Sequence, residues 1–133
     1  FFNYNENGKR EGFRTGIEEK YPLSKTTPNL TDVQHRLMFI QALEAVRALE
    51  DGVLMDIREG DVGAVLGWGF APWSGGPLSW LDILGTPYAA ERSQELCNTY
   101  GSRFDCPPLL ADMGKNNEAF YERFSPEKLD TTL

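Results

Sequence analysis

The chain has 133 residues, of which 41% are hydrophobic, and its 13 basic and 20 acidic residues give a net charge of -7. A chain of this length can bury roughly two-thirds of its unfolded surface, so it can build a core without metals or disulfides. The acidic balance argues against nucleic acid and anionic membrane surfaces as partners, because both select basic patches. No apolar run approaches the roughly 18 residues of a membrane-spanning helix, so no such span is expected.

Residues 1–30 predict an extended arm. Pro22 and Pro28 punctuate the segment, since each proline disfavours helix geometry in the residue before it. The segment is nevertheless too rich in aromatic side chains for a free linker, so we expect it to lie on a partner domain. The sequence opens on Phe1-Phe2 without a methionine, and we expect the chain to be part of a longer protein.

The strongest helix signal begins at Thr31. Thr31 and Gln34 have the spacing of a capping box, in which each side chain bonds the other residue's backbone N–H. Gly52 predicts the end of this helix, because glycine readily adopts the left-handed conformation there. Apolar residues recur every three or four positions and predict one buried stripe: Val33, Leu37, Ile40, Leu43, Val46 and Leu49.

Shorter helices are predicted over residues 58–66, 77–84, 86–100 and from 107 onward. Pro77 and Pro87 suit the first helical position, while Gly85 and Gly101 suit helix ends. No segment alternates apolar and polar residues with the two-residue period of a strand. The sequence therefore predicts an all-α fold, a compact bundle of about five helices over residues 31–133.

The most unusual segment is 67–77, with four glycines, two prolines and three large aromatic side chains. Surface loops are usually polar, so this apolar loop is expected to press against other protein. Gly67 and Gly69 resemble the start of a dinucleotide-binding fingerprint, but Pro72 stands at the third glycine position and has no N–H to offer a phosphate. Protein contact is the favoured interpretation.

No set of catalytic residues stands out. His35 is the only histidine, and neither Asp32 nor Glu44 is obviously placed to orient it as catalysis requires. Adjacent carboxylates, such as Glu59 and Asp61, fall at predicted helix ends, where they complement the helix dipole. Arg36 is flanked by the apolar stripe and suits a carboxylate or carbonyl clamp at a domain contact, with an ordinary surface ion pair as the alternative.

The two cysteines, Cys97 and Cys106, match no metal or redox spacing. Free thiols in a reducing cytosol are the favoured interpretation, and a disulfide remains an alternative. On this basis the expected location is cytoplasmic.

Several motifs, in order and spacing, resemble the carboxyl-terminal helical domain of 3-hydroxyacyl-CoA dehydrogenases. They lie at residues 32–37, 44–53, 61–65 and 67–77. The resemblance covers nearly the whole chain and is closest to the second copy of that domain in the multifunctional fatty-acid β-oxidation enzymes, which also carry enoyl-CoA hydratase activity. It implies a fold like the carboxyl-terminal domain of 6-phosphogluconate dehydrogenase, with residues 1–30 as the connector between the two copies.

The family oxidises 3-hydroxyacyl-CoA with NAD, but its histidine–glutamate pair and glycine fingerprint belong to a dinucleotide domain that this sequence lacks. No catalytic, cofactor-binding or metal-binding residue carries over to this chain, and Leu43 stands where related second copies often have a polar residue. The resemblance thus implies a non-catalytic chain, inactive alone, that packs on the dinucleotide and first helical domains and supports the acyl-CoA site. We also expect the isolated chain to self-associate.

Nine residues are candidates for that domain contact: Val33, Arg36, Leu37, Ile40, Trp68, Phe70, Trp73, Pro77 and Leu81. The sequence leaves open whether Trp73 lies in the helix cluster or on a partner surface. An alternative hypothesis is an independent helical module that binds a protein segment through the tryptophan-rich loop.

Overall fold

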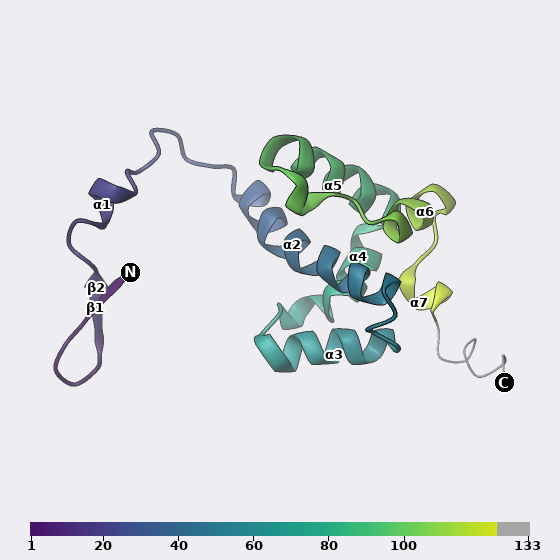
Figure 1. The fold of residues 1–133 in the computed structure, drawn as a ribbon, viewed down its shortest axis with the longest axis horizontal. Coiled ribbons are helices and arrows are strands. Elements are labelled where there is room, and N and C mark those ends of the chain that lie inside the picture. Colours follow the sequence, from purple (N-terminus) through teal and green to yellow (C-terminus); the bar gives the residue numbers. More distant parts are fainter. Residues whose placement is uncertain (125–133) are drawn as a thin grey trace. The chain divides into compact units, whose positions relative to one another are not determined.

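The computed structural model describes residues 1–124, and the chain divides into two units, residues 1–30 and the residues from Thr31 onward (Figure 1). The first unit holds a small two-stranded sheet and one short helix. The second is helical throughout its described part, as the hydrophobic periodicity predicts. Within residues 1–124, no helix is both long and apolar enough to cross a membrane.

The segment expected to be an extended arm, residues 1–30, contains a hairpin and a short helix that were not predicted. Strands β1 (Phe2–Tyr4) and β2 (Arg10–Phe13) pair antiparallel, and helix α1 (Ile17–Lys20) follows. The turn between the strands is closed by Asn5, whose side-chain oxygen accepts hydrogen bonds from the backbone of Asn7 and Lys9. The strands have three and four residues, too short for a two-residue alternation to show in the sequence.

Six helices make up the described part of the second unit, with two 3-10 turns between them. They are α2 (Leu30–Glu50), α3 (Ile57–Trp68), η1 (Pro72–Ser74), α4 (Pro77–Leu84), α5 (Thr86–Tyr100), η2 (Ser102–Phe104), α6 (Pro108–Asn116) and α7 (Phe120–Arg123). The predicted boundaries of α4 and α5 are confirmed. The last turn, α7, has only four residues and was not predicted.

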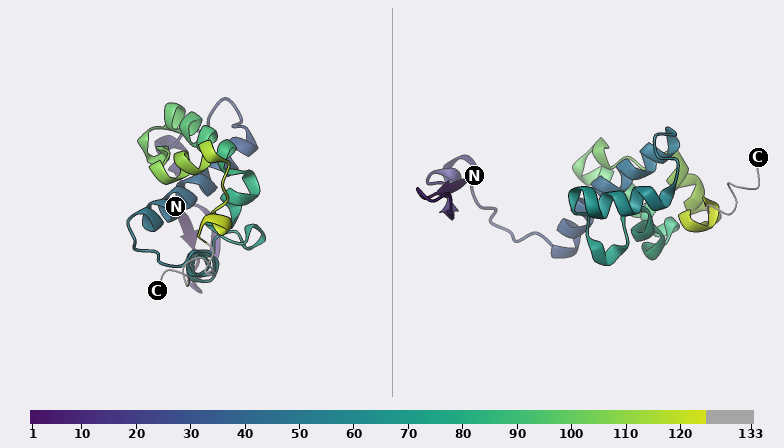
Figure 2. Two further views of the ribbon diagram at one scale, coloured as in Figure 1. Left: turned by 90° about the vertical axis from the view of Figure 1, so that its right-hand side faces the viewer. Right: turned by 90° about the horizontal axis from the view of Figure 1, so that it is seen from below.

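The long helix α2 runs through the middle of this unit, with α5 and α6 on one side and α3 on the other (Figures 1 and 2). Helix α5 packs against α6, and α4 contacts α3, α5 and α7. The core is one continuous apolar cluster to which all six helices contribute side chains. Its largest buried side chains include Phe39, Leu43, Leu78, Leu96 and Phe120.

The predicted apolar stripe of α2 is wrong in the first half of the helix. The buried residues are Phe39, Ala42, Leu43 and Val46, whereas Leu37 is 61% exposed. The ring of Phe39 meets that of Trp80 edge-on, with centroids 5.0 Å apart, so α4 covers the Phe39 face of the helix. The helix also starts at Leu30, which places Thr31 inside its first turn instead of at the predicted cap.

Helices α6 and α7 begin at residues that cannot cap them. Their cap positions are Pro107 and Ala119, which form no side-chain cap. Glu50 of α2 accepts a 2.5 Å hydrogen bond from the first-turn N–H of Leu109. Asp82 of α4 accepts from the N–H groups of α7 at Phe120 (2.7 Å) and Tyr121 (3.0 Å). Carboxylates from distant helices thus satisfy backbone donors that the local sequence leaves open.

Candidate functional site

Asp61 provides the same kind of remote cap for α4 and was misplaced by the sequence analysis. It was assigned to a helix end, where it would complement the helix dipole, but it lies within α3 and is only 1% exposed. Its carboxylate accepts from the N–H of Leu78 (2.8 Å) and from the N–H and hydroxyl of Ser79 (3.0 and 2.5 Å). The hydroxyl of Tyr121 donates a fourth hydrogen bond at 2.9 Å. Asp61 therefore joins α3, α4 and α7 through one buried carboxylate.

This cap holds one end of the loop at residues 67–77, which we call the glycine-aromatic loop. Helix α3 ends at Gly69, which adopts a left-handed conformation (φ 79°) and donates its N–H to the carbonyl of Ala64. The η1 turn follows, and Gly76 (φ 129°) approaches Asp61 so closely that a Cβ there would lie 2.4 Å from the Asp61 Cβ. The glycines at these two positions are required by backbone geometry and close contact.

The aromatic side chains of the loop point to different environments. Phe70 is buried in the core, whereas Trp68 and Trp73 are 62% and 75% exposed. The indole N–H of Trp68 donates to the side-chain oxygen of Gln41 on α2 at 3.1 Å. Trp73 thus lies on the surface of this chain, which answers the question that the sequence left open.

The nine predicted contact residues do not form one surface. Phe70, Pro77 and Leu81 are buried in the helical unit and cannot contact another domain as it stands. The remaining six lie in two places, which we call the α3 surface and the α2–α5 groove.

The α3 surface is our name for four exposed apolar side chains of α3 and of the loop after it: Val62, Leu66, Trp68 and Trp73. Val62 and Leu66 are four residues apart and so share one face of α3, whereas Trp68 lies at the end of the helix on the side of Gln41 of α2. The opposite face of the helix carries Ile57 and Ala64, which are buried in the core. A helix with apolar residues on both faces is typical of one that is covered on both sides.

The α2–α5 groove is a hollow of about 330 Å³, lined by Val33, Arg36, Leu37, Ile40, Tyr100, Arg103 and Phe104. Four of these residues are predicted contact candidates, all from α2. The other three, from the end of α5 and from η2, were not predicted from the sequence. A chain separation of some sixty residues gave no signal that these segments meet.

At the start of α2, His35 belongs to a polar cluster that joins α2 to α5. Arg92 of α5 donates from Nε to His35 Nδ1 (3.1 Å) and from Nη2 to Asp32 Oδ1 (2.6 Å). The other oxygen of Asp32 accepts from the hydroxyl of Tyr100. The His35 ring is also edge-on to the core rings of Phe39 and Trp80 and to the exposed ring of Tyr88. These contacts give His35 a role in fixing α2 against α5.

This cluster makes stability depend on pH. Burial and, secondarily, the Arg92 charge hold the pKa of His35 below its ordinary value, despite the opposing Asp32 carboxylate. Because the unfolded chain then takes up a proton before the folded one, the free energy of unfolding is expected to fall as pH drops from about 7 to about 5.5. Denaturant unfolding at the two pH values, with an NMR titration of the single imidazole, measures both quantities.

The matched control is His35→Gln, which keeps a hydrogen-bond acceptor and removes the titration. Its stability should change much less over the same pH interval. A measured His35 pKa at or above about 6.5, or equal pH dependence in the two proteins, would contradict this account.

Both cysteines are free thiols. A hydrogen bond to Asp105 raises the pKa of Cys97, and burial raises the pKa of Cys106, so both stay protonated near neutral pH. Thiolates are the reactive and metal-binding form. Within residues 1–124, no group of three or more His, Cys, Asp and Glu side chains is arranged to hold a metal ion.

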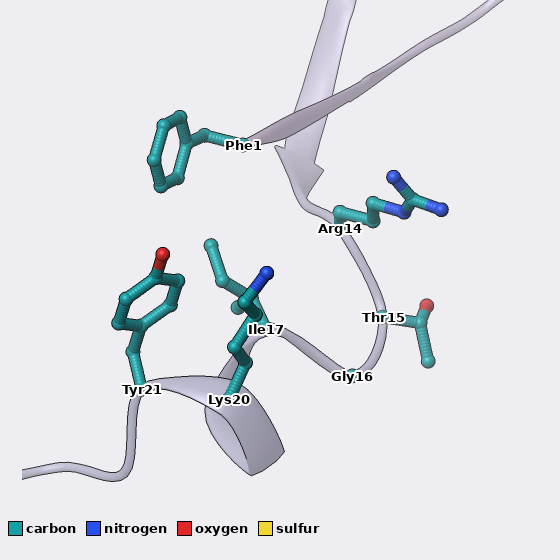
Figure 3. A pocket seen from close by; sticks show the side chains of 7 residues that line it. All are labelled: Phe1, Arg14, Thr15, Gly16, Ile17, Lys20 and Tyr21. Carbon is teal, nitrogen blue, oxygen red and sulfur yellow. The ribbon is translucent and has the colours of Figure 1, made fainter.

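The first unit has a hollow of its own, of about 430 Å³ (Figure 3). Phe1 lies on one side of it, opposite Tyr21, Ile17 and Lys20, while Arg14 points away. Binding sites for small molecules usually hold a few precisely placed polar groups among buried apolar walls. Helix α1 has no buried residue, so this hollow lacks such walls.

No protein-family model matches the chain. The sequence motifs and the surfaces described above are therefore the basis for assigning a function.

Proposed function

We propose that this chain is the second carboxyl-terminal helical domain of a multifunctional β-oxidation 3-hydroxyacyl-CoA dehydrogenase. Its fold is that of the 6-phosphogluconate dehydrogenase carboxyl-terminal domain, and its role is to pack on the first helical copy and on the dinucleotide domain. NAD and acyl-CoA bind to the parent protein, in the cytoplasm, and this chain contributes no catalytic residue. It supports the acyl-CoA site by holding its neighbours in place.

The observation that carries the proposal is the exposed apolar α3 surface. Leu66 is 80% exposed and Trp73 is 75% exposed, although Leu66 directly precedes the 67–77 loop and Trp73 belongs to it, and this loop is held to the core through Phe70 and Asp61. Large apolar side chains on a rigid support are typical of a protein–protein contact. The motifs at residues 61–65 and 67–77, which gave the resemblance, supply this surface, and the helical unit supports the proposed architecture.

A second candidate function, an independent helical module that binds a protein segment, is favoured by the same exposed surface. The two hypotheses differ in what is encoded before Phe1. A dinucleotide domain in the upstream reading frame supports the dehydrogenase proposal, whereas a start codon directly before Phe1 supports the independent module.

Association with the parent protein is the direct test. We expect this chain to co-purify with the remainder of the parent protein when the two are expressed together. Val62→Glu and Leu66→Glu should abolish co-purification, because each buries a charge in an apolar contact, and should leave the melting temperature of the chain nearly unchanged.

In the absence of the parent, the wild-type surface is expected to drive self-association, measured by analytical ultracentrifugation.

The control is Val53→Glu, an equally exposed position in the loop after α2, which should still co-purify. The isolated chain should show no NADH oxidation with acetoacetyl-CoA. Turnover by the isolated chain, or undiminished association of both α3 variants, would overturn the proposal.

A further inference from the structure

We propose that the α2–α5 groove docks an amphipathic helix of a partner protein, one that carries a carboxylate at the edge of its apolar face. This inference goes beyond the proposed function, because it concerns a different surface from α3 and names the chemistry of the occupant.

The apolar part of the groove is a ridge along one side of α2. Val33, Leu37 and Ile40 follow one another at steps of four and three residues, so they lie in a row along the helix. Leu37 is largely exposed, and Phe104 closes the groove from η2 and is itself buried. Rows with this spacing are the surface onto which another helix packs.

The charged part of the groove consists of Arg36 and Arg103. None of the seven lining residues is acidic, although the chain as a whole carries a charge of -7. Among the described residues, neither arginine forms a salt bridge, whereas Arg92 and Arg123 each hold two carboxylates. The Tyr100 hydrogen bond and, to a smaller extent, the Arg36 charge lower the pKa of nearby Asp32. The groove itself nevertheless holds two positive side chains and no acidic one, which in an acidic protein favours an anionic partner.

Arg36 is also fixed in place. Its guanidinium carbon lies 4.1 Å from the centroid of the Tyr100 ring, and the Tyr100 hydroxyl is held in turn by Asp32. The Nε of Arg36 is buried and has no hydrogen-bond partner. Asp32 itself already binds Arg92. A carboxylate brought by a partner would supply the paired acceptor oxygens that a guanidinium favours.

The shape of the groove favours a helix over a small ligand. Tyr100 and Arg103 line both this groove and the next hollow, which also contains Arg47 and Glu44. The two hollows therefore adjoin each other at Tyr100 and Arg103, so a helix in the first has room to continue beyond it. In the second hollow, Arg47 is paired with Glu44 at 2.6 Å and Asp105 is a further acidic residue, so the excess of positive charge lies toward the first hollow and Arg36.

The test is a selection of displayed helical peptides against the full chain, followed by affinity measurements on the enriched peptides. We expect enrichment of peptides with apolar residues at helical spacing and an adjacent Asp or Glu. Arg36→Gln should weaken their binding about tenfold to a hundredfold, the range for a hydrogen bond to a charged group. Chemical shifts should change on α2, Tyr100 and Arg103.

Three variants keep the result interpretable. Arg36→Lys should recover only part of the affinity, because it restores the charge without the paired donors. Arg123→Gln, on α7, should bind as the wild type does. Val62→Glu should also bind normally, which separates this inference from the α3 surface. No enrichment, enriched peptides without a carboxylate preference, or full affinity in a folded Arg36→Gln protein would each overturn the proposal.

Discussion

Asp61→Asn is expected to lower the free energy of unfolding by about 3 kcal/mol, a large share of the stability of a domain this size. The Asp61 carboxylate accepts four hydrogen bonds, two of them from the first turn of α4. An amide presents an NH₂ group in place of one oxygen, so a buried donor would face other donors. Chemical denaturation of the two proteins measures the difference.

The matched control is Glu59→Gln, a change of the same kind at an exposed position of the same helix. It should alter stability by less than about 0.5 kcal/mol. Gly76→Ala tests the same contact from the other side. Its added Cβ would collide with Asp61 in a backbone conformation that alanine rarely adopts, so it too should destabilise strongly. Equal stability of Asp61→Asn and Glu59→Gln would contradict the remote-cap interpretation.

Phe39→Ala is expected to cost about 3–5 kcal/mol, the usual range for removing a buried aromatic side chain. Phe39 is fully buried and packs edge-on against Trp80 of α4. The substitution would leave a cavity at the point where α2 crosses the core. Thermal and denaturant unfolding followed by circular dichroism report the change.

Leu37→Ala is the control on the same helix. Leu37 is exposed, so its truncation should cost less than about 1 kcal/mol. The pair also tests which face of α2 is buried. A larger loss of unfolding free energy in Leu37→Ala than in Phe39→Ala would support the buried stripe predicted from the sequence. It would contradict the burial of Phe39 in the structure.

The presence of two apolar faces on α2 explains why the buried face of this helix was predicted wrongly. Both faces of the first half of the helix are apolar, one with Val33, Leu37 and Ile40 and the other with Phe39 and Ala42. Periodicity alone cannot choose between two such faces. The choice depends on Trp80, which covers Phe39 but is forty-one residues away in sequence.

The helix caps likewise divide into those set by neighbouring residues and those set by residues distant in the sequence. The start of α4 at Gly76-Pro77 and the ends at Gly85 and Gly101 followed from local backbone preferences and were predicted correctly. The groups that satisfy the first-turn N–H donors of α4, α6 and α7 come from other helices, so the carboxylates of Glu50, Asp61 and Asp82 were not recognised as caps.

The sequence by itself determined the helical class, most helix boundaries and the acidic character of the chain, because these depend on neighbouring residues and on composition. The family and function that its motifs suggest remain proposals. Only the tertiary structure decided that Trp73 is exposed, that Asp61 is buried, and that Arg36 and Arg103 border one groove. The physical reason is that burial and pairing are properties of segments that meet in space, and a hydrogen bond or apolar contact between distant residues leaves no local pattern.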